Sequence, residues 1–312
     1  MTPVTEPART VDRLTGGLSA SFGAGLFLGL APASALAGWW LVIALVAAAA
    51  LAVLFALSTA DRAPGPLGSA LGILGRIAGA VAVAGTCGAY VLPDQPDVVA
   101  VTLVVVIAGV ALLAPPLPPV VHRVAVGVVL VVLAIVVTAC FAIAPVDLAV
   151  APPPDAAGAD DPVGLLPAAA LLFVCFTGPP VAGRRTRLAV VGVVLAVCVA
   201  VAVGVLRQLG GERLALSRAP LRDALGAADA ASVTGLLALG VTVACALALH
   251  SLFTDIGARA STLRIGRPVL AAAVLTALGA LLLDPVPALV GAAVLLLGEA
   301  GFRVLAGRRR RA

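Results

Sequence analysis

Long apolar runs separated by short polar segments dominate the pattern of this chain. A membrane-spanning helix needs about 20 predominantly apolar residues. On this basis the pattern predicts ten spans, with nine or eleven as alternatives because the fourth and ninth runs are short and the sixth is interrupted. The predicted spans are residues 14–32, 35–58, 67–92, 98–114, 120–143, 163–180, 188–206, 231–253, 268–283 and 287–306.

The composition agrees with this pattern. Hydrophobic residues make up 62% of the 312 residues and charged residues 11%, more apolar surface than one soluble core can hide. The sequence therefore predicts an all-α integral membrane protein in contact with the lipid bilayer. The net charge of +5 comes from arginines spread along the chain and indicates no nucleic-acid partner.

Cysteines and catalytic motifs give no sign of an enzyme. The five cysteines lie singly in apolar runs, without the CxxC spacing or His partners of a metal site. The sequence also has no recognisable Ser-His-Asp set, phosphate-cradling loop or paired intramembrane carboxylates. We therefore expect no cofactor, no metal and no catalytic residues.

Arginines predict the orientation, because Arg-rich short loops stay in the cytoplasm. With the N-terminus inside, sixteen of the twenty arginines fall on inner segments. The other four share one outer loop: Arg207, Arg213, Arg218 and Arg222. The pattern thus predicts a multi-pass plasma-membrane protein with both termini cytoplasmic and with residues 145–162 and 207–229 outside.

The ten spans divide into two halves of five. Residues 14–144 form the first repeat and 163–306 the second, joined by an outer loop at 145–162, with tails at 1–13 and 307–312. An odd number of spans in each half places the halves in opposite orientation, which makes a 5+5 inverted repeat. The first and sixth spans are interrupted at equivalent places, by glycines at 23 and 25 and by Gly178-Pro179-Pro180. The alternative is close helix packing through a GxxxG face at Gly25 and Gly29.

Four stretches carry a family resemblance. They are SFGAGLF at residues 21–27, Gly88-Ala-Tyr90, the sixth span from Leu165 to Gly178 with its Phe-Thr-Gly turn, and the segment from Leu214 to Leu225. In this order they resemble the first helix, the end of the third, the sixth helix and the outer amphipathic segment of the amino acid–polyamine–organocation family of permeases. The chain departs from that family where Pro179-Pro180 replaces a Phe-Glu pair and a longer helix, and in having ten spans instead of twelve or more.

The resemblance implies the leucine-transporter-type fold and a secondary transporter. Its implied substrate is a small neutral amino acid or related amine, moved by alternating access, because residues 81–87 and 237–245 beside the breaks are small and apolar. Uniport, exchange, or a cation site of carbonyls and hydroxyls is expected, since spans one to nine place no acid at mid-depth. The alternative is a non-transporting, degenerate permease-like subunit or scaffold. The oligomeric state stays open.

Substrate binding is expected mainly from the backbone at the two breaks. Free N–H groups at Ala24 to Leu26 would meet a carboxylate, carbonyls at Cys175 and Phe176 would meet an ammonium, and Phe176 would act as a lid. The predicted substrate-binding residues are Ser19, Ser21, Gly23, Ala24, Gly25, Leu26, Cys175, Phe176, Thr177 and Gly178.

Other polar residues receive plainer interpretations. Arg76 is predicted to snorkel to the inner face. Tyr90, Trp39 and Trp40 are predicted to belong to the interfacial aromatic belt. His122 and His250 are predicted to be solvated helix ends, with a proton relay as the alternative.

Overall fold

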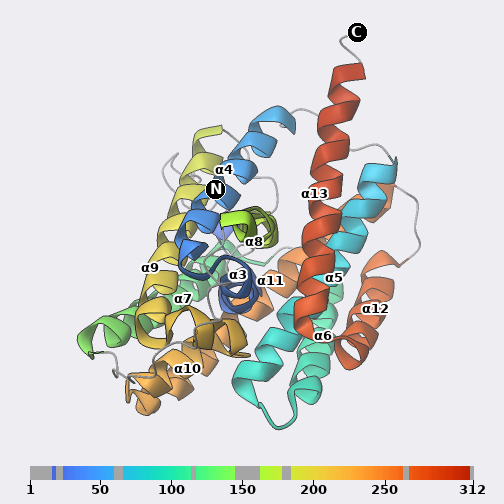
Figure 1. Cartoon of the computed structure of the whole chain (residues 1–312). Coiled ribbons are helices and arrows are strands. Elements are labelled where there is room, and N and C mark those ends of the chain that lie inside the picture. Colours follow the sequence, from blue (N-terminus) through green and yellow to red (C-terminus); the bar gives the residue numbers. More distant parts are fainter. Residues whose placement is uncertain are drawn as a thin grey trace, which may run out of the picture.

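The computed structural model describes residues 16–18, 24–59, 66–113, 117–144, 162–177, 184–262 and 267–309. This described part is helical almost throughout and contains no β-strand (Figure 1). The observed class agrees with the all-α integral membrane protein expected from the hydropathy pattern.

Helices of the first half follow the predicted apolar runs closely. Residues 16–18 are helical, and the elements after them are α2 (Ala24–Phe27), α3 (Leu30–Ala37), the 3-10 helix η1 (Gly38–Trp40), α4 (Leu41–Thr59), α5 (Pro66–Val91), α6 (Pro96–Leu113) and α7 (Pro119–Ala142).

The second half begins with a short, irregular segment and continues with long helices. Its elements are η3 (Pro162–Gly164), α8 (Leu165–Leu172), η4 (Phe173–Phe176), α9 (Arg184–Leu216), α10 (Pro220–Ala227), η5 (Ala231–Val233), α11 (Thr234–Thr262), α12 (Pro268–Leu282) and α13 (Pro285–Arg309). Helix α9 is kinked at Gly210.

Prolines set many of the helix starts. The helices α5, α6, α7, α10, α12 and α13 each begin with a proline. Proline suits the first helical position because its fixed φ is helical and the N–H it lacks would have no helical partner there. The sequence therefore marks these boundaries directly.

Seven described helices are long and apolar enough to cross a membrane. Two shorter apolar helices, Pro162–Phe176 and Pro268–Leu282, accompany them. One of the seven candidate spans, Leu30–Leu57, includes α3, η1 and most of α4. The backbone leaves helical geometry between α3 and α4 at Gly38, where φ is 50° and ψ is −125°.

Helices from the two halves pack against one another throughout the bundle. Helix α4 contacts α9, α5 contacts α11, and α6 contacts α12. The irregular segments meet in the same way, because α3 contacts α8 and α2 contacts η4. Figure 1 shows α3 and α8 near the middle of the molecule, with the longer helices around them.

Helices α5 and α11 form the buried centre, while α6, α12 and α4 present apolar side chains outward. Val105 of α6, Leu282 of α12 and Leu54 of α4 are more than half exposed, as lipid-facing residues would be. Trp39 is 61% exposed and Trp40 38%, which fits their predicted place in an aromatic belt.

Candidate functional site

The first span is irregular where α2 gives way to α3. Helix α2 is a four-residue segment that begins at Ala24, and a turn at Leu28 and Gly29 separates it from α3. The Gly29 amide donates to the Gly25 carbonyl at 3.1 Å, so the chain remains tightly wound across the turn. The predicted site residues Ser19, Ser21 and Gly23 lie outside the described residues.

The sixth span changes from α-helix to 3-10 helix. Helix α8 passes into η4 at Phe173, and the regular structure ends at Thr177, whose φ and ψ are −88° and 38°. The Thr177 hydroxyl donates to the Val174 carbonyl at 2.9 Å and so caps its own turn. Gly178 lies outside the described residues.

The two irregular segments touch at Gly25 and Cys175. A Cβ atom added to Gly25 would lie 2.8 Å from the Cys175 Cα atom, which is closer than real side chains approach a backbone. Gly25 therefore allows α2 to reach η4. Leu26, Cys175 and Phe176 are all buried around this contact. The structure thus brings together these four predicted residues, in surroundings that are mostly apolar.

Tyr90 is buried beside this contact, so its predicted place in the interfacial belt is wrong. Its side chain is only 2% exposed, and its ring packs edge-to-face on Phe27 with centroids 6.0 Å apart. The Tyr90 hydroxyl donates to the Phe27 carbonyl at 3.1 Å and accepts from the Leu221 amide at 3.2 Å. One side chain of α5 therefore touches both α2 and α10.

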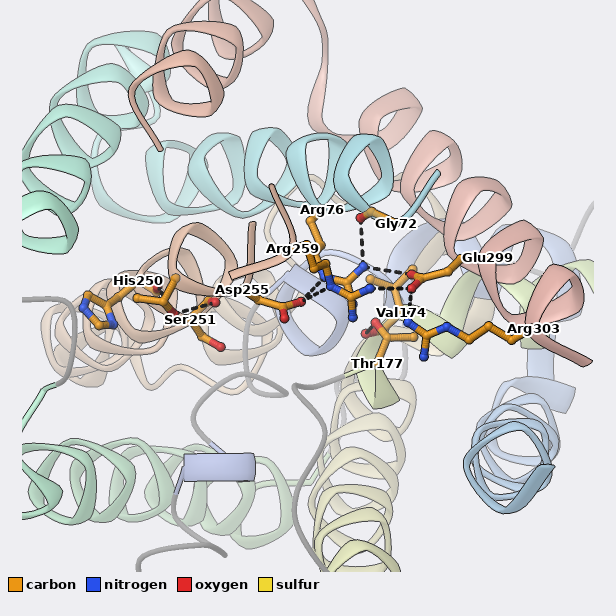
Figure 2. Close-up of polar contacts among 11 residues, drawn as sticks. Gly72, Arg76, Val174, Thr177, His250, Ser251, Asp255, Arg259, Glu299 and Arg303 are labelled. Atoms are coloured by element: carbon orange, nitrogen blue, oxygen red, sulfur yellow. Dashed lines mark hydrogen bonds and ion pairs between the residues drawn. The ribbon is translucent and has the colours of Figure 1, made fainter. Parts of the chain in front are cut away.

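A network of five charged side chains joins α5, α11 and α13 (Figure 2). Arg76 of α5 pairs with Asp255 of α11 and, at 2.9 Å, with Glu299 of α13. Arg259 of α11 bonds both carboxylates, Asp255 at 2.9 Å and Glu299 at 2.6 Å. Arg303 completes the network by pairing with Glu299 one helical turn earlier. We call these five residues the ion-pair network.

The Glu299 carboxylate lies directly against α5 at Gly72. The side chain of Glu299 is only 6% exposed. A Cβ atom on Gly72 would lie 2.6 Å from a Glu299 carboxylate oxygen, so glycine at this position leaves room for the carboxylate where it bonds the arginines. The Gly72 carbonyl also accepts a hydrogen bond from Arg76 at 2.8 Å. Helix α13 is thereby fixed against α5 by charge and by shape.

Burial of Arg76 contradicts the prediction that it snorkels to water. The residue is 7% exposed, and two carboxylates compensate its charge inside the bundle. Desolvating charged groups is costly unless partners and hydrogen bonds offset the penalty. Ionisable residues within membrane helices are for this reason often functional.

The ion-pair network lies close to the end of the sixth span. Segment η4 contacts α13, and Figure 2 shows Val174 and Thr177 next to Glu299 and Arg303. Neither Asp255 nor Glu299 is among the sequence-predicted site residues. Their signal in the sequence is a single acid inside or beside each of two long apolar runs.

His250 is buried in α11 rather than solvated at a helix end, so that prediction is also wrong. The residue is 4% exposed, and its backbone carbonyl accepts a hydrogen bond from the Thr254 hydroxyl at 3.0 Å. His250 precedes Asp255 along α11, as Figure 2 shows.

Comparison with known proteins gives relatives in two mycobacterial species. The chain is 33% identical over 291 residues to an uncharacterized transporter of Mycobacterium bovis, an alignment that covers 82% of this chain and 65% of the relative. Uncharacterized transporters from two strains of Mycobacterium tuberculosis match with the same identity and coverage. The chain thus spans about 65% of the length of the curated relatives it matches. No protein-family model matches the chain.

Proposed function

We propose that this protein is a secondary transporter that moves a small neutral amino acid or related amine across the plasma membrane by alternating access. The observation that carries the proposal is the contact between Gly25 and Cys175, where two irregular membrane segments from different halves meet. Irregular backbone at membrane depth is tolerated where protein buries it or where it lines a cavity. Paired interruptions of this kind are typical of transporter binding sites.

Helix packing supports the ten-span, 5+5 inverted-repeat architecture. Splitting Leu30–Leu57 at Gly38 and counting the two shorter apolar helices turns the seven long spans into ten. Helices at equivalent places then pack as partners, α4 with α9, α5 with α11 and α6 with α12. A two-fold axis in the membrane plane would produce such pairing. The named relatives, uncharacterized transporters, favour the same class of function.

The surroundings of the contact favour a neutral substrate. Leu26, Cys175 and Phe176 offer an apolar wall, and Thr177 and the backbone provide polar groups. A charged substrate side chain would lose its hydration there without gaining a partner. The ion-pair network would form part of the inner barrier, because its inter-helix ion pairs fix α13 to α5 and α11 near η4.

Uptake into proteoliposomes tests the proposal directly. We expect the purified chain to take up labelled L-alanine, with an excess of unlabelled glycine or serine competing and arginine, lysine or glutamate competing poorly. Empty liposomes and a Gly25→Val variant serve as controls. Absence of uptake and binding for every neutral amino acid tested would instead favour the non-transporting subunit, a reading that the short sixth span of Pro162–Phe176 supports.

A further inference from the structure

Tyr90 joins two segments that are far apart in the sequence. Its hydroxyl bonds the Phe27 carbonyl and the Leu221 amide, at 3.1 and 3.2 Å. Phe27 is the last residue of α2, and Leu221 is the second residue of α10. The backbone groups at such helix ends lack helical partners and need others. A single hydroxyl satisfies one group at each end.

Helix α10 is a rigid unit rather than a loose connection. Leu221, Ala224 and Leu225 form a fully buried face, and the helix packs on α7, α9 and α11. Its start is held by Ser217, whose hydroxyl bonds Asp223 and accepts from the Ala219 amide at 3.2 Å. Its end is held by the Ala230 amide, which donates to the Leu225 carbonyl at 2.9 Å. Movement of α10 would therefore carry the Leu221 amide with it.

At its other end, Tyr90 holds the segment that contains the candidate site. Phe27 follows Gly25 by two residues in the same short helix, and Gly25 rests on Cys175. The contact of the Tyr90 and Phe27 rings, at 73° between their planes, fixes the side of α2 on which the hydroxyl bonds. Tyr90 thus provides a direct path from α10 to the segment that holds the Gly25–Cys175 contact.

We propose that Tyr90 is a positioning residue that couples α10 to the irregular segment of the first span. This inference rests on the proposed transport function and on the predicted topology, which places residues 207–229, and with them α10, outside. With both hydrogen bonds made, α10 and α2 are held together and the Gly25–Cys175 contact is closed. Opening on the side of α10 breaks at least one of the two bonds.

Tyr90→Phe is the direct test, because it keeps the ring on Phe27 and removes both hydrogen bonds. The measurement is the rate at which N-ethylmaleimide modifies each cysteine of the purified protein, read by peptide mass spectrometry. All five cysteines are free and buried. Cys175 reports on the site and Cys140 of α7 serves as the internal reference, because Cys198 hydrogen-bonds Cys175 and Cys245 lies near Tyr90. Loss of the hydroxyl should raise the Cys175 rate about tenfold and leave Cys140 unchanged.

Thr86→Val is the matched control. Thr86 lies on the same helix and is equally buried, but its hydroxyl bonds only its own helix, at the Ala82 carbonyl, 2.6 Å away. This variant should leave the Cys175 rate unchanged. An unchanged rate in Tyr90→Phe, the same increase in Thr86→Val, or an equal increase at all five cysteines would each overturn the proposal.

Ser217→Ala supplies a second test that starts from α10 and leaves Tyr90 intact. This substitution loosens the start of α10 and should raise the Cys175 rate several-fold. In the double variant with Tyr90→Phe, the rate should equal that of Tyr90→Phe alone. Tyr90 is also the only tyrosine of the chain, so 3-fluorotyrosine incorporated into the Ser217→Ala protein gives a single ¹⁹F resonance. Its shift should differ from that of the parent protein. An unchanged Cys175 rate together with an unchanged ¹⁹F shift would overturn the coupling even if Tyr90→Phe failed to insert.

Labelled L-alanine uptake separates this inference from the proposed function. If the parent chain transports L-alanine, Tyr90→Phe should raise its KM about tenfold at unchanged amounts of folded protein. If the parent chain takes up no amino acid while the selective increase at Cys175 persists, the proposed function fails and the coupling by Tyr90 stands. If uptake is normal and Cys175 is unaffected in Tyr90→Phe, the coupling fails alone.

Discussion

Gly25 is the residue on which the contact between the two irregular segments depends most. In Gly25→Val the new side chain would overlap the Cys175 backbone. We expect a loss of about 1–3 kcal/mol in the free energy of unfolding and no L-alanine uptake. Thermal unfolding in detergent and proteoliposome uptake measure the two effects.

A valine elsewhere provides the control for Gly25→Val. Gly109 of α6 has open space where its Cβ atom would lie. Gly109→Val should therefore change both stability and uptake little. Equal losses in the two variants would mean that the effect comes from adding a β-branched residue to a membrane helix and not from the contact with Cys175.

Glu299 is the carboxylate on which three arginines converge. Glu299→Gln keeps the shape of the side chain but leaves Arg76, Arg259 and Arg303 with a neutral partner in a buried place. Breaking a buried ion pair from one side typically costs about 3–5 kcal/mol. We expect a destabilisation of that order, measured by denaturant unfolding in detergent.

Glu212→Gln is the matching surface substitution. Glu212 is exposed on α9, and surface changes of this kind usually stay within about 0.5 kcal/mol. A loss for Glu299→Gln no larger than that for Glu212→Gln would show that the ion-pair network contributes little to stability.

Helices α5 and α13 fit together through Gly72 and Glu299. Gly72→Ala would push the carboxylate away, because the added Cβ atom would lie 2.6 Å from its oxygen. Glu299→Asp shortens the same side chain by one methylene. We expect Gly72→Ala to cost about 1–3 kcal/mol and the double variant to cost less than the sum of the single ones.

A double-mutant cycle of unfolding free energies measures this coupling between α5 and α13. Hydrogen exchange along Pro285–Arg309 should rise in Gly72→Ala and fall again in the double variant. Additive losses, with exchange unchanged along α13, would contradict direct contact between the two positions.

Helix positions were largely predictable because long apolar runs and prolines mark them. The predicted spans at 67–92 and 120–143 differ by one residue at each end from Pro66–Val91 and Pro119–Ala142. Larger differences occur where helices extend past their apolar part, as α9 does to Leu216 and α11 to Thr262. The apolar pattern ends with the lipid-facing residues, whereas the helical backbone hydrogen bonds continue through the polar residues that follow.

The candidate site was predictable only in part. Glycine and proline disturb helices locally, so the irregular segments around Gly25 and Thr177 leave a direct signal in the sequence. The ion-pair network leaves a weaker one, because Arg76, Asp255 and Glu299 lie on three spans that only the tertiary fold brings together. The burial of Tyr90 and its bonds to α2 and α10 were missed for the same reason. The partners of its hydroxyl are backbone groups of distant segments, and backbone groups are the same for every residue type, so the sequence does not predict them.

The bundle as a whole can be oriented by its arginines, and that orientation can be tested at exposed described residues. The predicted topology places the start of η5 outside and the start of α5 inside. Ser232 and Leu67 are exposed at these two ends. In intact cells, a membrane-impermeant maleimide should label a Ser232→Cys protein and spare a Leu67→Cys protein, because the native cysteines are buried.

Permeabilised cells complete the test of topology, since both engineered cysteines should then be labelled. The result bears on the proposed mechanism, because an N-terminus inside puts α10 on the outer surface and the ion-pair network toward the cytoplasm. Access from outside would then pass α10 and Tyr90, and access from inside would pass Glu299 and Arg303. Labelling of Leu67→Cys but not Ser232→Cys in intact cells would reverse the two paths. The ion-pair network would then lie at the outer entrance, and α10 at the inner one.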